Sequence, residues 1–385
     1  MRLGKAQKAT DPGSLETRGG PPPIAVIRGP GKRRASRIAM ASAPCCAHGA
    51  ILRKSFALDR RLPVKSYIAS QKALPGAQRG QERRYMAWTN PLKEQIRVVG
   101  TSCELTPFVF RGRLYRLENF MRFHDFTGKD PAYRFHEDGF RIRDVESDRI
   151  LSVPLLNHYF AIAFPWNDRV YVFAGDYEDT LPWWNIRRTV MISSDDLITW
   201  TSPRVVMEAE NGEHLFNYAV CRAHGRFFML YETNDRRWPA FTMRFCESDD
   251  LVHWRKLGTD HIYGTDKYTG GPALYHDGEQ DWFYCLYLED LGDRKWETRI
   301  TRSRDLKSWQ DAPAGRPVVT FDETRDVNAE VWPGVKERSA SDVELCEFEG
   351  KTHVYWINGN QEGAASEYRG TVDGPMNRYL RAFFG

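Results

Sequence analysis

The sequence predicts an all-β fold, a five-bladed β-propeller with about four antiparallel strands in each blade. The first observation behind this prediction is a recurring pattern, S-x-D-L-x-x-W, which occupies residues 194–200, 248–254 and 303–309. The copies start 54 and 55 residues apart, a period typical of blade-sized repeat units. The second observation is a series of short turns containing Gly, Asn or Asp that separate β-rich runs, which is a hairpin signal.

The repeated pattern has a local physical explanation. Ser and Asp favour turns because their side chains hydrogen-bond to nearby backbone groups. Leu and Trp then pack back onto the sheet, and a strand-like run precedes each copy, as in residues 242–246. The pattern therefore marks a turn between strands, and we assign no chemistry to it.

Hairpin turns divide the chain into five units. Two flanking units lack the Trp pattern but keep the hairpin. The five turns are Arg111-Gly112, Asn167-Asp168, His224-Gly225, Asp277-Gly278 and Glu349-Gly350. Five units of about four strands each predict a propeller, and atypical end units are expected where a ring closes or is capped.

Residues 1–86 form a separate segment, and residues 87–385 form the propeller domain. The first segment carries 18 of the 55 Lys and Arg residues but 4 of the 51 Asp and Glu residues. Its Pro-rich, aperiodic composition predicts a disordered or non-native extension, with Met86 as the natural start. A basic nucleic-acid arm and a twin-arginine export signal at Arg33-Arg34 are the alternatives. The acidic remainder argues against nucleic acid as a partner of the domain.

The sequence holds no apolar run of 18 residues, so we expect no transmembrane helix and no membrane partner.

Seven cysteines are present, and those beyond residue 86 show no CxxC or His-paired spacing for zinc. Buried free thiols in a reducing compartment are the expected state. We therefore expect a cytoplasmic protein.

Residues 100–385 resemble the five-bladed propeller glycoside hydrolases, a group that includes the family 43 arabinofuranosidases and xylosidases. The resemblance rests on the S-x-D-L-x-x-W turns and on the segments 341–351, 359–363 and 379–384. It looks closest to uncharacterised members of that group. It implies hydrolysis of a glycosidic bond in a poly- or oligosaccharide, as in polysaccharide degradation. No redox cofactor is implied, and an axial metal ion stays open because no ligand cluster argues for one.

In such enzymes the pocket lies on the axis, where the innermost strands begin. Counting back eight residues from four hairpin glycines gives equivalent strand-start positions. These positions are Glu104, Asn217, Gly270 and Asp342. The unit near Trp166 aligns less cleanly and offers His158 or Tyr159. Second strands end at the same face, which adds Glu232.

Glycoside hydrolysis needs one protonated and one ionised carboxyl group. We therefore predict Asp342, Glu104 and Glu232 as catalytic residues. Asp342 is short and would leave room for a water molecule in an inverting reaction. A longer glutamate would serve as the acid if a dry pocket raised its pKa.

Five further residues are predicted to bind substrate. Glu344 follows Asp342 by two positions and so points to the same face of its strand. His158 and Asn217 could bind sugar hydroxyls, and Trp183 and Trp238 could stack on a sugar ring.

The chain departs from family 43 at one point. Those enzymes place their acid in a Glu-Gly-Pro start of an inner strand, whereas residues 270–272 read Gly-Gly-Pro. Two alternatives to a hydrolase therefore remain, a carbohydrate-binding propeller without catalysis and a scaffold for protein partners.

Overall fold

The computed structural model describes residues 88–98, 104–120, 138–177, 185–238 and 241–385. Nearly all of them belong to β-strands or the turns between them, and the predicted all-β class is confirmed. The predicted extension, residues 1–86, lies outside the described residues. Within the described part, no helix is long and apolar enough to cross a membrane.

Three sheets each contain four strands in sequence order and are antiparallel throughout. The first contains β2 (Glu104–Phe110), β3 (Arg113–Phe120), β4 (Gly139–Asp144) and β5 (Ile150–Leu156). The second contains β6 (His158–Trp166), β7 (Arg169–Asp176), β8 (Arg188–Ser194) and β9 (Arg204–Glu208). The third contains β10 (Leu215–Ala223), β11 (Arg226–Thr233), β12 (Thr242–Ser248) and β13 (Arg255–Lys256).

A larger sheet joins two further groups of four strands. One group is β14 (Gly270–Asp277), β15 (Trp282–Gly292), β16 (Lys295–Ser303) and β17 (Trp309–Asp311). The other is β20 (Ser339–Phe348), β21 (Lys351–Gly359), β22 (Ala365–Asp373) and β1 (Lys93–Val98). A short parallel pairing between β16 and β20 links the groups. The early strand β1 completes the second group by pairing with β22.

Among the described residues, four short elements lie outside these groups. They are the hairpin of β18 (Asp326–Asn328) and β19 (Trp332–Lys336), the 3₁₀ turn η3 (Thr259–His261) and helix α1 (Met376–Arg381).

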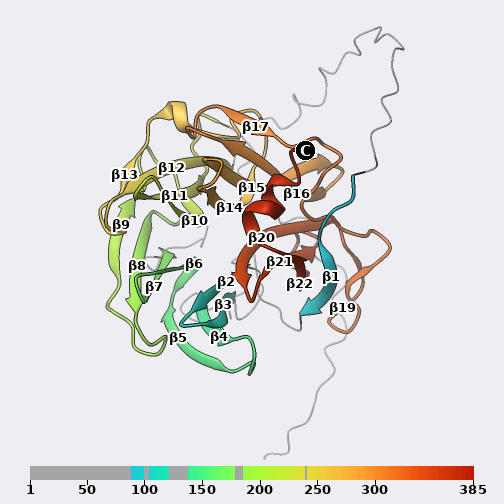
Figure 1. The fold of residues 1–385 in the computed structure, drawn as a ribbon, viewed down its shortest axis with the longest axis horizontal. Helices are drawn as coiled ribbons and strands as arrows, with labels where there is room; N and C mark the ends of the chain where they lie inside the picture. Colours follow the sequence, from blue (N-terminus) through green and yellow to red (C-terminus); the bar gives the residue numbers. More distant parts are fainter. Residues whose placement is uncertain (1–87, 99–103, 121–137, 178–184, 239–240) are drawn as a thin grey trace, which may run out of the picture. The chain divides into compact units, whose positions relative to one another are not determined.

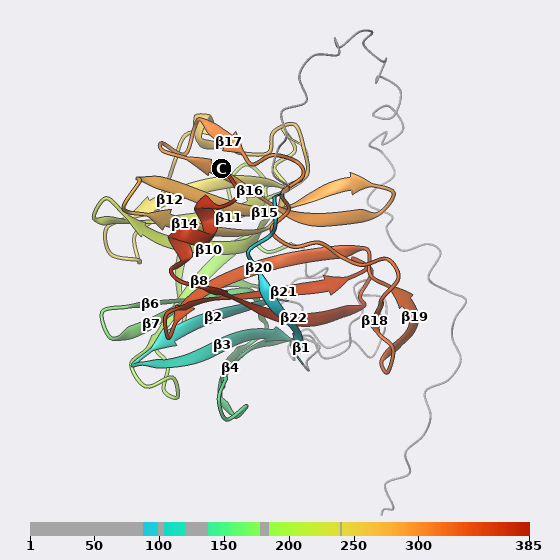
Figure 2. The same cartoon turned by 45° about the vertical axis from the view of Figure 1, so that its right-hand side comes forward.

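The first strands of the groups contact one another in a cyclic order. β2 contacts β6, β6 contacts β10, β10 contacts β14, β14 contacts β20, and β20 contacts β2. In Figure 1 the other strands of each group extend outward from these first strands, and Figure 2 shows the same sheets from the side. The starts of five strands that are distant in the sequence therefore meet in one region.

The hydrophobic core lies between successive sheets. One cluster packs Phe108 and Leu117 against Val172, and another packs Phe173 against Met229. The same arrangement continues through the third sheet into the joined sheet. Apolar residues thus occupy both faces of the sheets, which explains the near-continuous apolar runs of the inner strands. Four cysteines, Cys221, Cys246, Cys285 and Cys346, are buried free thiols within strands of the sheets, as expected.

The S-x-D-L-x-x-W copies form the predicted turns. In the middle copy, the Asp250 carboxylate accepts hydrogen bonds from the backbone N–H groups of Val252 (2.9 Å) and His253 (2.8 Å). The Ser248 hydroxyl accepts one from the N–H of Leu251 (3.0 Å). Leu251 is buried at a φ of 67°, a left-handed conformation that costs a leucine about 1–2 kcal/mol. Burial of its side chain offsets this cost.

Leu251→Ala is expected to lower the free energy of unfolding by about 2–4 kcal/mol, because the truncation leaves a cavity in the core. Ile198→Ala, at the exposed position that follows the equivalent leucine in the first copy, should change it by less than about 0.5 kcal/mol. Equilibrium unfolding in urea measures both values. Equal effects would contradict the packing role assigned to the repeated leucine.

Candidate active site

Four of the five innermost strands carry the same irregularity near their starts. The antiparallel register shifts there, and one residue in each shift has a positive φ. These residues are Phe160 (55°), Asn217 (31°), Gly271 (54°) and Asp342 (54°). Such β-bulges redirect side chains and recur beside active sites. Equivalent bulges in four sheets therefore present one residue each to the region where the strands meet.

All four bulge residues line one small cavity. Glu104 and Glu344 also line it, so the cavity gathers three carboxyl groups and one amide. Its remaining lining residues are Leu105, Thr106, Ala161, Ile162, Tyr218 and Pro272. The cavity volume of about 30 Å³ accommodates a water molecule or two.

Glu232 lies behind this lining, at the end of β11, and is 3% exposed. Its carboxylate accepts a hydrogen bond from the Asn217 amide (3.0 Å) and another from the backbone N–H of Gly271. It therefore connects the bulges of two strands. Burial raises the pKa of Glu232 to about 8, although both hydrogen bonds act in the opposite direction.

Asp342 is the most acidic of the site's carboxyl groups. Burial raises its pKa to about 6, and a hydrogen bond from the Ser341 hydroxyl (2.5 Å) opposes the rise. A Cβ atom on Gly271 would lie 2.8 Å from Asp342 Oδ1. This close approach and the positive φ of 54° together favour glycine at position 271.

Glu104 and Glu344 hold their protons more strongly. Burial raises the pKa of Glu104 well above its usual value, and the negative charges of Asp342 and Glu232 raise it further. Burial also raises the pKa of Glu344 to about 8. The Tyr275 hydroxyl donates to Glu344 (2.6 Å) and accepts from the N–H of Leu345 (2.7 Å). Near neutral pH the site therefore combines an ionised aspartate with protonated glutamates, the division that acid–base catalysis requires.

Five of the predicted site residues come together. They are Glu104, Asn217, Glu232, Asp342 and Glu344. His158 is placed otherwise, because its Nδ1 lies 2.8 Å from the carbonyl oxygen of Leu156 and Phe160 takes the cavity position of its strand. Trp238 stacks under the Arg237 guanidinium at 4.4 Å and is absent from the described lining. Trp183 lies outside the described residues.

Phe160, Gly271 and two tyrosines were not predicted from the sequence. Tyr275 anchors Glu344, and the Tyr268 hydroxyl would lie 2.7 Å from a Cβ atom on Gly270. Burial and the nearby charges of Glu232 and Asp342 raise the pKa of Tyr268. Both tyrosines flank the Gly-Gly-Pro segment. Their position beside a predicted strand start is the feature of the sequence that could have identified them.

Gly271→Ala is expected to destabilise the protein through backbone strain and through displacement of the Asp342 carboxylate. Gly334→Ala is the matched control, because Gly334 has a φ of 78° but open space around its Cβ position. The first variant should lose at least about 1 kcal/mol more unfolding free energy than the second. Urea unfolding of both proteins gives the difference. Equal losses of unfolding free energy would show that the contact with Asp342 does not restrict the residue type at position 271.

No family model matches this sequence, and no curated protein matches it in sequence. Solved structures are similar in fold. The BT0996 RGII complex has a TM-score of 0.55 at 14% identity, covering 75% of the present protein and 93% of the matched one. A protein described as a glycoside hydrolase has a TM-score of 0.53 at 14% identity, covering 74% and 92%.

Other similar structures include glycoside hydrolases of families 43 and 32. A xylan beta-1,4-xylosidase from Bacillus halodurans has a TM-score of 0.49 at 15% identity, and 54% of its length is covered. At such identities the likeness concerns the fold. The structures with TM-scores of 0.55 and 0.53 share the fold of this protein, so the expected resemblance to the β-propeller glycoside hydrolases is confirmed at the level of the fold.

Proposed function

We propose that this chain is a glycoside hydrolase, built as a five-bladed propeller, that cleaves a glycosidic bond in an oligo- or polysaccharide. The observation that carries the proposal is the gathering of four carboxyl groups with raised pKa where the first strands meet. Desolvating several carboxyl groups at one place is costly. Such clusters are typical of sites where protonated and ionised carboxyl groups act together.

The five-blade count rests on strand order and contacts. Each of the five groups contains four strands, and the first strands contact one another in a cycle from β2 to β20 and back. β1 supplies the fourth strand of the last group, so segments from both ends of the domain share one blade. This pairing is the expected way to close a propeller ring.

Asp342 serves as the general base and Glu104 as the general acid in this proposal. Asp342, with a pKa of about 6, is ionised at neutral pH and takes a proton from a water molecule. The water oxygen attacks the anomeric carbon, while Glu104 gives its proton to the departing glycosidic oxygen. A cavity sized for water beside Asp342 suits the inverting version, in which water lies between base and sugar. The sugar itself lies at the cavity mouth.

The remaining polar groups have supporting roles. Glu232 fixes Asn217 and the Gly271 backbone, and the negative charge of Asp342 helps to keep Glu104 protonated. Asn217 and Glu344 line the cavity and are proposed to bind substrate hydroxyl groups. No redox cofactor takes part.

Two observations favour a second candidate function, carbohydrate binding without catalysis. Gly270 occupies the strand start at which the resembling family places its acid, and the cavity of about 30 Å³ is too small to hold a sugar ring. A binding propeller could keep the carboxyl cluster as a hydrogen-bonding platform and lack a working acid.

The test is a screen of the purified full chain against aryl glycosides and polysaccharides. We expect release of aryl alcohol or of new reducing ends, with inversion at the anomeric carbon seen by NMR. Affinity electrophoresis in polysaccharide gels runs in parallel. Binding without hydrolysis would favour the second candidate, and absence of both would contradict a carbohydrate substrate.

A further inference from the structure

Two histidines and an aspartate converge in a second place, at the turns that join the strands of neighbouring sheets. His224 lies in the β10–β11 turn, His276 lies near the end of β14, and Asp281 lies in the turn that follows. His224 Nε2 is 2.6 Å and His276 Nε2 is 3.1 Å from the same oxygen, Asp281 Oδ1. One ligand-type atom from each residue falls within 4.8 Å of the other two.

Aromatic contacts hold the two imidazoles in this arrangement. The rings lie 5.2 Å apart at 77° to each other. Phe283 packs against both, with centroid distances of 5.8 Å to His224 and 4.8 Å to His276. Phe228 adds a further edge contact to His224. The convergence of the two Nε2 atoms is therefore supported by packing as well as by the shared carboxylate.

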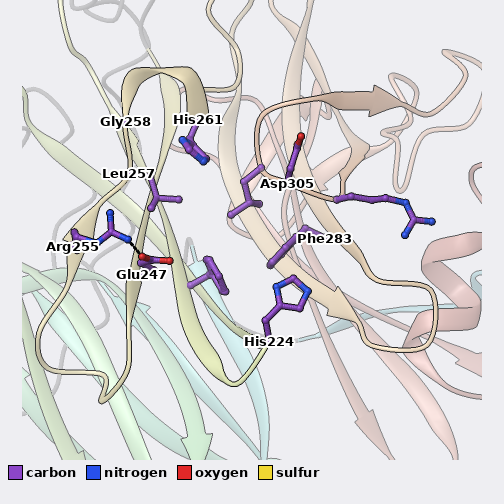
Figure 3. Close-up of a pocket in the computed structure, with 11 residues that line it drawn as sticks. His224, Glu247, Arg255, Leu257, Gly258, His261, Phe283 and Asp305 are labelled. Carbon is purple, nitrogen blue, oxygen red and sulfur yellow. Dashed lines mark ion pairs between the residues drawn. The ribbon is translucent and has the colours of Figure 1, made fainter.

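The cluster is open to solvent on the His224 side. Side-chain exposure is 48% for His224 and 54% for Asp281, against 8% for His276. His224 also lines a pocket of about 310 Å³, whose lining includes Phe228 and Phe283 (Figure 3). Arg304 donates to the backbone carbonyl oxygens of Gln280 and Asp281 and stacks on Trp282, so its guanidinium is engaged away from the carboxylate. An ion could reach the three side chains through this opening.

We propose that His224, His276 and Asp281 bind one divalent transition-metal ion of the zinc type. Two imidazole nitrogens and one carboxylate oxygen form a donor set that zinc prefers. Ligand atoms at about 2.0–2.2 Å from a tetrahedral zinc ion lie about 3.3–3.5 Å apart. The two histidine–aspartate separations of 2.6 Å and 3.1 Å lie within an ångström of that spacing, and the two histidine nitrogens lie within 4.8 Å of each other. Water fills the fourth position.

Such an ion would join the turn of the third sheet to the turn of the fourth group of strands. It would replace a shared hydrogen-bonded carboxylate with three coordinate bonds. The cluster lies outside the carboxyl site and shares no residue with it. The inference therefore stands independently of the proposed hydrolase activity.

The test uses the tag-free full chain, stripped with EDTA and titrated with ZnCl₂ in a calorimeter. We expect one zinc ion per chain and a midpoint of thermal unfolding that rises with zinc concentration. Cobalt(II) should give the visible absorption bands of a four-coordinate complex. His276→Ala and Asp281→Asn should each weaken zinc binding at least about tenfold.

His253→Ala is the matched control. His253 also pairs with an aspartate, Asp250, at 2.6 Å, but in the described structure no second histidine joins that pair in a ligand cluster. This variant should bind zinc like the parent chain. If His276→Ala fails to fold, His224→Gln replaces it, because this substitution lies at an exposed position. Unfolding of each variant in EDTA shows whether it is folded without zinc. Unchanged affinity in the folded cluster variants, or less than one zinc ion per parent chain, would overturn the proposal.

Discussion

Asp342→Asn is expected to lower kcat by about 10²–10⁴-fold, because the amide cannot accept the proton of the attacking water. The substitution is nearly isosteric, and asparagine tolerates the positive φ of 54° at this bulge better than most residues. The Ser341 hydroxyl can still donate to the remaining side-chain oxygen. We therefore expect KM to change little, and steady-state kinetics on a substrate from the screen separate the two constants.

Asp293→Asn is the matched control, since Asp293 also has a positive φ (52°) but lies exposed in the turn after β15. It should leave kcat and KM unchanged.

Loss of stability does not explain the expected effect at Asp342. A carboxyl group with a raised pKa stabilises the fold fully only below its unfolded-state pKa, and this contribution is lost as the pH rises through about 6. The asparagine side chain does not titrate, so the Asp342→Asn variant should be at least as stable as the parent at neutral pH. Full activity in it would refute the assignment of the base.

The fold could be predicted where its causes are local. The Ser, Asp and Leu of each repeat act within a few residues, as the bonds from Ser248 and Asp250 show, so the sequence pattern marks these turns. The pairing of β1 with β22 could not be predicted in this way. Lys93 pairs with Thr371, from which most of the domain's sequence separates it. β1 is short and aperiodic, so nothing in its sequence indicates which strand it pairs with.

The site could be predicted only as far as the strands are regular. Counting from hairpin glycines identified Glu104, Asn217 and Asp342. It failed by one or two residues at Phe160 and Gly271, because a bulge or a longer turn changes the count.

Side-chain clusters that cross sheets were beyond sequence reasoning altogether. His224 and His276 are distant in the chain, and they meet only because β10 packs beside β14. The same holds for Glu232 and its contact with the Gly271 backbone. No spacing between residues in the sequence indicates that such side chains lie together.

Glu104→Gln is expected to lower the hydrolysis of natural linkages by about 10²–10⁴-fold, because a poor leaving group needs a proton in the transition state. Aryl glycosides with acidic leaving groups need little protonation and should lose far less. The ratio of the two losses therefore reports on the acid specifically. A residue that only supports the fold would lower both rates alike.

The pH dependence of the same variant provides a second check. In the parent protein kcat/KM should rise with pH through about 6, as Asp342 loses its proton. It should fall again at higher pH, where Glu104 finally ionises from its raised pKa. Glutamine does not titrate, so Glu104→Gln should keep the rising limb and lose the falling one. Glu344 has a pKa of about 8 and is the competing acid. If Glu344→Gln removes the falling limb while Glu104→Gln retains it, the proton comes from Glu344 and the proposed roles of the two glutamates must be exchanged.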